Sequence, residues 1–104
     1  MYSQEEILAK IKSIVLEEIP DAKVYLFGSR VTGKVHEESD WDVLAITLKE
    51  VNREMKAGVQ KKLADRMNDF YYFIDLKIVN EKEWFESPSH YVLRESIKDE
   101  ALAI

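Results

Sequence analysis

Apolar residues recur along the first part of the chain with the period of an α-helix. Over residues 3–19 they form one stripe, separated by charged residues: Ile7, Leu8, Ile11, Ile14, Val15 and Ile19. A stripe of this kind is typical of a surface helix that buries one side. Ser3 and Glu6 have the spacing of a capping box, and the residue before Pro20 is disfavoured in a helix. The pattern therefore predicts a helix that stops at Pro20.

Three shorter apolar runs have the β-branched and aromatic content of strands. They cover residues 22–27, 40–48 and 70–79, and the third run is the richest in such side chains. The polar residues 28–39 between the first two runs contain two of the three glycines. We expect three strands, with a loop between the first and the second.

Helical periodicity returns on either side of the third strand. Residues 51–69 are predicted to form a second long helix, which Gly58 weakens. Its apolar stripe consists of Val51, Met55, Val59, Leu63 and Met67. Residues 81–104 are expected to form two short helices, because Ser87 and Pro88 suit a cap and a first helical position. The order of elements predicts an α/β (α+β) fold in which the helices cover mainly one face of a small sheet.

Composition narrows the class of protein. The 104 residues are 46% hydrophobic and contain no cysteine, which predicts a single domain (residues 1–104) and excludes a disulfide framework or a thiolate zinc site. The lack of cysteine favours a reducing, cytoplasmic location. We expect no membrane span and no signal peptide. The net charge of −5 argues against extended nucleic-acid binding.

Aspartates stand where strands are usually apolar. Asp40 and Asp42 open the second strand and project to the same face, about 7 Å apart along the chain. Asp75 lies within the third strand. If these strands are neighbours, the three carboxylates form a cluster suited to Mg²⁺. The alternative is a turn residue followed by charges that protect a sheet edge.

Gly28 and Ser29 follow the first strand directly. A glycine at this place lets a phosphate approach the backbone, and a serine donates both a hydroxyl and an N–H. An ordinary turn that ends a strand would have the same two residues, so the pair gains its meaning from the aspartates that follow.

In order, these features resemble the nucleotidyltransferase superfamily of the DNA polymerase β type, and in particular the minimal nucleotidyltransferases. The family pattern is an apolar residue with Gly-Gly or Gly-Ser, about ten residues, Asp-x-Asp, and a later carboxylate on a strand. Here it reads Phe27-Gly28-Ser29, Asp40-Trp41-Asp42 and Asp75. Small members often have Gly-Ser-Arg-Ala-Arg-Gly; this chain keeps Arg30 and has Thr32 at the second arginine. The resemblance covers essentially the whole chain.

The resemblance implies a nucleotidyltransferase fold with a mixed sheet of three to four strands, and a role for each motif residue. Gly28 and Ser29 would hold the triphosphate of ATP. Asp40, Asp42 and Asp75 would bind Mg²⁺, expected as two ions, and Asp75 would also activate the incoming hydroxyl. That hydroxyl would attack the α-phosphate and release pyrophosphate.

Two cations are candidate nucleotide ligands. Arg30 lies close enough to Ser29 in sequence to touch a phosphate, although a solvated loop arginine is an equal alternative. Lys77 shares a strand face with Asp75, and it could bind a phosphate or pair with a site carboxylate. Trp41 is expected to point the other way, into the core beneath the helices.

The resemblance also suggests a partner. Small stand-alone members commonly act as the antitoxin of a HEPN-domain ribonuclease toxin, and in that family AMP can be transferred from ATP to a toxin tyrosine. This protein adenylyltransferase antitoxin is our leading hypothesis. One alternative is an antitoxin that neutralises its toxin by occlusion, without catalysis. Another is a transferase for a small molecule such as an aminoglycoside, and a homodimer is left open.

Overall fold

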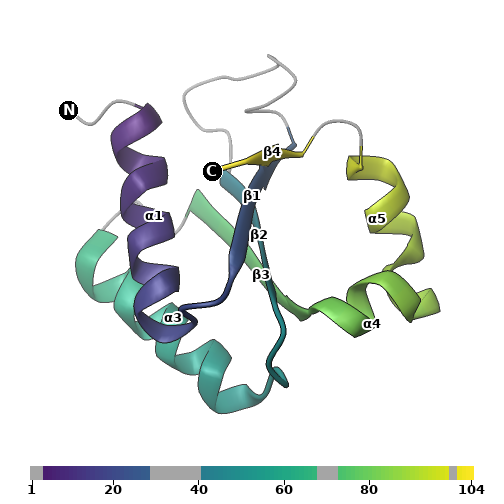
Figure 1. The fold of residues 1–104 in the computed structure, drawn as a ribbon. Helices are drawn as coiled ribbons and strands as arrows, with labels where there is room; N and C mark the ends of the chain where they lie inside the picture. Colours follow the sequence, from purple (N-terminus) through teal and green to yellow (C-terminus); the bar gives the residue numbers. More distant parts are fainter. Residues whose placement is uncertain (1–3, 29–40, 68–72, 99–100) are drawn as a thin grey trace.

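The computed structural model describes residues 4–28, 41–67, 73–98 and 101–104. Figure 1 shows a central sheet with helices on both sides. The elements follow the chain in this order: α1 (Gln4–Glu18), β1 (Lys23–Phe27), β2 (Trp41–Thr47), α3 (Arg53–Met67), β3 (Ile74–Asn80), α4 (Glu81–Glu86), a 3₁₀ turn (Pro88–His90), α5 (Tyr91–Ile97) and β4 (Leu102–Ala103). Among the described helices, none is long and apolar enough to cross a membrane.

The sheet is mixed and has the strand order β3-β2-β1-β4. β1 pairs with β2 and with β4 in antiparallel fashion, whereas β2 and β3 run parallel. A parallel pair needs a crossover connection, and the chain between β2 and β3 contains α3. The mixed α/β fold predicted from the sequence is confirmed.

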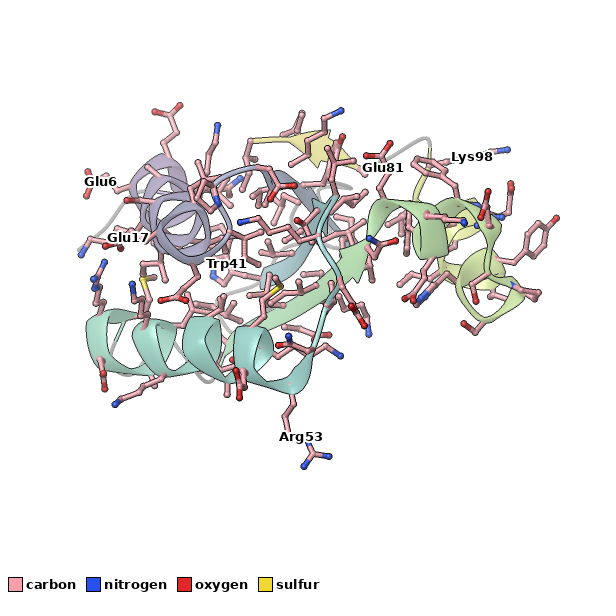
Figure 2. The ribbon with its side chains drawn as sticks, turned by 60° about the horizontal axis from the view of Figure 1, so that its bottom comes forward. Glu6, Glu17, Trp41, Arg53, Glu81 and Lys98 are labelled. Carbon is pink, nitrogen blue, oxygen red and sulfur yellow. The ribbon has the colours of Figure 1, made fainter. Side chains whose placement is uncertain are left out.

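The two long helices, α1 and α3, cover one face of the sheet (Figure 1). Their apolar stripes meet alternate residues of the strands in one core cluster, in which Ile11, Val15 and Leu63 are fully buried. Trp41 lies in this cluster, as expected, and only 2% of its surface is exposed. Figure 2 shows it between the two helices.

Charged side chains pair the C-terminal end of α1 with α3. Lys62 Nζ lies 2.9 Å from Glu18 Oε1, and Arg66 makes two hydrogen bonds to Glu17. Both pairs are partly exposed to solvent. Their stabilising effect is therefore small beside that of the apolar contacts beneath them.

The other face of the sheet is partly covered by the C-terminal helices. Trp84 of α4 and Ile97 of α5 are buried in a second core cluster, together with Phe27, Leu44 and Val79 of the strands. The predicted break between two short helices is present. The Ser87 side chain accepts from the backbone N–H of Ser89, and Pro88 opens the 3₁₀ turn that precedes α5.

Some boundaries differ from the prediction. β2 ends at Thr47, and Leu48, which was expected in the strand, is 72% exposed. The Asp21 carboxylate accepts from the Thr47 hydroxyl and the Leu48 N–H, and it thereby fixes the chain where the strand ends. β4 was not expected: Ala-Leu-Ala has no strand character, and its two residues pair with β1. The predicted cap Ser3 and the start of the third strand, residues 70–72, lie outside the described residues.

Candidate functional site

Two aspartates predicted to share a site lie side by side in the sheet. Asp42 of β2 and Asp75 of β3 are register partners in the parallel pair. Neighbouring strands are about 4.8 Å apart, and register partners project to the same face. The sheet thus holds two carboxylates next to one another on adjacent strands.

Both carboxylates point away from α1 and α3. Their sequence neighbours Trp41, Val43 and Leu76 belong to the core under those helices, so the alternating residues face the other way. Asp42 is half-buried and Asp75 is exposed. As its spacing predicted, Lys77 lies on the same face as Asp75, and the structure shows that it is also exposed.

The turn after β1 packs against one of these carboxylates. Phe27 is the register partner of Asp42, and Gly28 follows it with φ +80°. A Cβ added to Gly28 would overlap Asp42 Oδ2 and would lie 3.1 Å from Asp42 Cγ. Only glycine combines this backbone conformation with so close an approach. Gly28, in the turn after β1, therefore lies against Asp42 of β2, which in turn neighbours Asp75 of β3.

Three of the predicted site residues, Ser29, Arg30 and Asp40, lie outside the described residues. Asp40 immediately precedes Trp41, the first residue of β2. Within the described part of the chain there is no group of three or more His, Cys, Asp or Glu side chains that could hold a metal ion. The described site thus contributes two of the three predicted carboxylates.

The donor set of Asp42 and Asp75 fits a hard divalent cation. Paired carboxylates on one face repel each other unless a positive charge lies between them, and Mg²⁺ is usually bound by one or two carboxylates together with substrate phosphates. The open backbone of Gly28 beside Asp42 is the kind of surface that a phosphate can approach. The residues present therefore fit a metal–phosphate group.

The resolved pKa shifts among the described residues belong to structural contacts elsewhere. A hydrogen bond from the Leu48 backbone lowers the pKa of Asp21, against the opposing effect of desolvation, and the Thr47 hydroxyl lowers it further. The Arg66 side chain lowers the pKa of Glu17. Asp21 lies where β2 ends, and Glu17 lies at the contact between α1 and α3.

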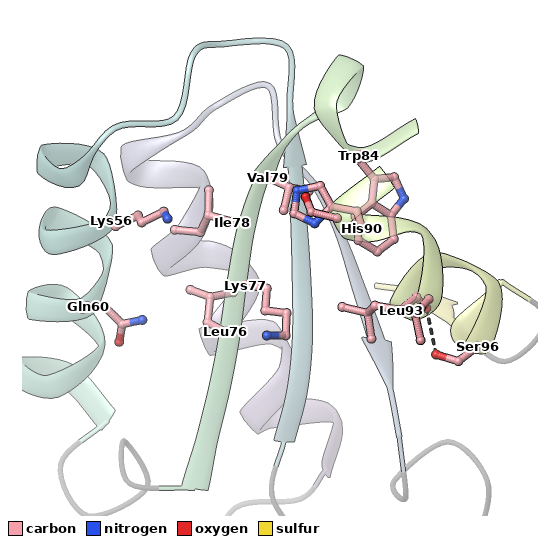
Figure 3. Close-up of a pocket in the computed structure, with 12 residues that line it drawn as sticks. Lys56, Gln60, Leu76, Lys77, Ile78, Val79, Trp84, His90, Leu93 and Ser96 are labelled. Atoms are coloured by element: carbon pink, nitrogen blue, oxygen red, sulfur yellow. Dashed lines mark hydrogen bonds between the residues drawn. The ribbon is translucent and has the colours of Figure 1, made fainter. Parts of the chain in front are cut away.

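A groove of about 630 Å³ begins one residue beyond Asp75. Its lining includes Lys77 and, from α3, Lys56 and Gln60 (Figure 3). In the sequence, Lys56 lies off the apolar stripe of its helix, which places it on the polar side and no more. Which strand that polar side borders depends on the sheet order, so no local signal could place Lys56 in the groove.

The sequence model of the nucleotidyltransferase domain family matches residues 8–103. The chain belongs to this family. Its predicted motif Phe27-Gly28-Ser29, Asp40-Trp41-Asp42 lies within the matched range. No curated protein matches the chain.

Several solved structures have the same nucleotidyltransferase fold. One, designated a nucleotidyltransferase, is 24% identical with a TM-score of 0.67, over 94% of this chain and 97% of that one. A toxin–antitoxin structure with AMP-PNP is 22% identical with a TM-score of 0.62, and the match covers 91% of this chain and 69% of that one. A third is the complex of a tri-AMPylated Shewanella oneidensis HEPN toxin with MNT antitoxin. It is 19% identical with a TM-score of 0.62, and the match covers 97% of this chain and 71% of that one. At these identities the likeness establishes the fold.

Proposed function

We propose that this nucleotidyltransferase domain transfers AMP from ATP to a tyrosine hydroxyl of a HEPN-domain toxin and thereby acts as an antitoxin. The observation that carries the proposal is the pairing of Asp42 with Asp75, beside the glycine turn at Gly28. In the proposal Asp40 joins them as the third carboxylate, and the domain comprises residues 1–104.

Asp40, Asp42 and Asp75 are the residues that would hold Mg²⁺, with two ions expected. When bound, the metal neutralises phosphate charge and polarises the α-phosphate. Asp42 is fixed by its position on β2 and by the Gly28 backbone packed against it. Gly28 and Ser29 would orient the triphosphate through their backbone N–H groups, and Arg30 and Lys77 would contact phosphate oxygens.

The proposed reaction is one in-line substitution at phosphorus. The tyrosine oxygen forms a bond to the α-phosphorus, and the bond from that phosphorus to the bridging oxygen breaks, so that pyrophosphate leaves with the electron pair. Asp75, which is exposed on β3, accepts the hydroxyl proton. The products are AMP-tyrosine and pyrophosphate, and positioning accounts for most of the acceleration.

Fold relatives support the choice of acceptor. Solved proteins of this fold include the MNT antitoxin bound to a tri-AMPylated HEPN toxin, and a toxin–antitoxin structure with AMP-PNP, an analogue of ATP. The same fold with a paired carboxylate site makes an equivalent reaction the best-supported proposal here. We place the protein in the cytoplasm, where ATP and Mg²⁺ are both present.

The test is to incubate the protein with ATP, Mg²⁺ and the HEPN-domain toxin that the proposal assigns to it, and then to measure the mass of the toxin. We expect the toxin to gain one or more AMP units with the wild type and none with Asp42→Asn. Asp65→Asn is the matched control, because Asp65 is an exposed aspartate on α3, away from the site. An unmodified toxin in the wild-type reaction would contradict the proposal.

The same variants, tested in cells that express the toxin, separate catalysis from occlusion. If the protein neutralises its toxin by binding alone, Asp42→Asn should protect cells as well as the wild type does. Loss of both mass gain and protection in Asp42→Asn, with both kept in Asp65→Asn, is the result that the catalytic proposal predicts.

A further inference from the structure

The groove beside Asp75 runs along the edge of the sheet. Four consecutive residues of β3, from Leu76 to Val79, line it. Successive side chains of a strand point to opposite faces, so a cavity that touches four in a row cannot lie on one face alone. It must follow the strand's outer edge, where the backbone forms its floor.

The walls of the groove come from both sides of the sheet. Lys56 and Gln60 of α3 stand on one side of β3, and Trp84, Leu93 and Ser96 of the C-terminal helices stand on the other (Figure 3). β3 ends the strand order and, among the described strands, pairs only with β2. An edge strand presents a row of N–H and C=O groups that can pair with another strand.

The charge of the groove is opposite to that of the chain. The chain has 20 acidic residues against 15 basic ones, yet none of the described residues that line the groove is an Asp or a Glu. The groove contains Lys56, Lys77 and His90 instead. Apolar surface from Trp84, Leu76 and Ile78 separates these groups. The groove thus complements a segment that is extended, partly apolar and negatively charged.

We propose that an extended acidic segment of the acceptor protein docks in this groove by adding a strand to β3. Main-chain hydrogen bonds to β3 would supply affinity, and alternate side chains would meet the two walls. Because Leu76 directly follows Asp75, the end of such a segment lies next to the carboxylates, where a neighbouring tyrosine would be presented. This inference rests on the proposed function for its acceptor, but the docking itself requires neither ATP nor metal.

A second copy of this chain is a poorer occupant of the same groove. If β3 paired with the β3 of another copy, the lysines of one groove, Lys56 and Lys77, would face the equivalent lysines of the other copy. Like charges facing each other across paired strands are destabilising. Each β3 is also recessed between its own walls, whereas a segment that projects from a partner can enter.

The test uses backbone NMR of the full chain, without ATP or Mg²⁺. Two short capped probe peptides are titrated: Glu-Val-Glu-Val-Tyr and its charge-reversed form Lys-Val-Lys-Val-Tyr. We expect the acidic peptide to shift the amides from Leu76 to Val79 and to protect those whose N–H groups point away from β2. The lysine peptide should bind at least about tenfold more weakly, a difference of about 1.4 kcal/mol.

Lys56→Glu tests the charge of one wall. It should weaken the acidic peptide about tenfold and strengthen the lysine peptide, and the helix should tolerate it because glutamate is favourable near a helix N-terminus. Lys61→Glu is the matched control: it makes the same charge change on the same helix, at an exposed residue outside the groove lining. It should leave both affinities unchanged.

Three results would overturn the proposal: equal binding of the two peptides, chemical shifts confined to residues outside β3, or protection of the β3 amides by self-association in the absence of peptide. Because no step depends on transfer of AMP, a failure here is distinguishable from a failure of the transfer assay.

Discussion

The carboxylate of Asp42 packs directly on the backbone of Gly28, so that a single methyl group at Gly28 would overlap it. This contact joins the turn after β1 to the first residues of β2, two segments that the family motif separates by ten residues. The glycine is therefore required by the position of the carboxylate as well as by its own φ of +80°.

Gly28→Ala should accordingly damage both stability and transfer. We expect a loss of about 1–3 kcal/mol in the free energy of unfolding, from the strained backbone and the displaced Asp42 side chain. AMP transfer should fall by more than the unfolded fraction explains. Urea unfolding and a transfer assay on the same preparation measure the two effects.

Gly58→Ala is the contrasting variant. Gly58 lies inside α3, and an added Cβ would lie 3.1 Å from Glu18 Oε2, the end of a flexible side chain. That carboxylate can shift, so alanine's better helix propensity should dominate and stabilise the fold by up to about 1 kcal/mol. Equal effects of the two alanines would contradict the distinction between a site glycine and a helix glycine.

Asp21 predicts how stability depends on pH. The Leu48 backbone N–H and the Thr47 hydroxyl donate to its carboxylate, which lowers its pKa in the folded state. A carboxyl with a lowered pKa stabilises the fold above its unfolded pKa of about 3.9, and that contribution is lost as the pH falls through the folded pKa.

Asp21→Asn should therefore lower the free energy of unfolding at neutral pH, by about 1 kcal/mol after allowance for solvent exposure. The difference from the wild type should shrink as the pH falls below about 4. Urea titrations at neutral pH and at acid pH measure it. A difference that stays constant over this range would show that the ionised form of Asp21 has no special role.

The α1–α3 contact should be maintained by its apolar core, not by its ion pairs. Leu63 is fully buried between the helices and the sheet, so Leu63→Ala should cost about 2–5 kcal/mol. Arg66→Ala removes only an exposed pair with Glu17 and should lower the stability far less, with a still smaller effect at high salt. Thermal unfolding at two salt concentrations distinguishes these outcomes.

Much of the fold followed from local patterns. The stripes of α1 and α3, the strand runs and the Ser87-Pro88 break each have a short-range physical cause, and the structure confirms them. β4 has no such cause, because its two residues form a strand only by pairing with β1. The end of β2 before Leu48 likewise depends on a hydrogen bond to Asp21, a residue distant in sequence.

Part of the candidate site also followed from local patterns, and the rest depends on the tertiary fold. Alternation along each strand predicted that Asp75 and Lys77 share a face, and the structure confirms it. The sequence made the approach of Asp42 to Asp75 conditional on neighbouring strands, and the parallel register of β2 with β3 supplies that condition. The groove along β3 could not be predicted, since it depends on which strand ends the sheet and on how the two helical layers flank it.

The central claim is that Asp42 and Asp75 act as one site for AMP transfer. A double-mutant cycle tests it most directly: kcat/KM for AMP transfer to the HEPN toxin is measured for the wild type, Asp42→Asn, Asp75→Asn and the double variant. Residues that act as a unit are non-additive, so each single variant should lose about 10³-fold or more and the double variant little further. Losses that multiply in the double variant, or a single variant with wild-type activity, would contradict the account.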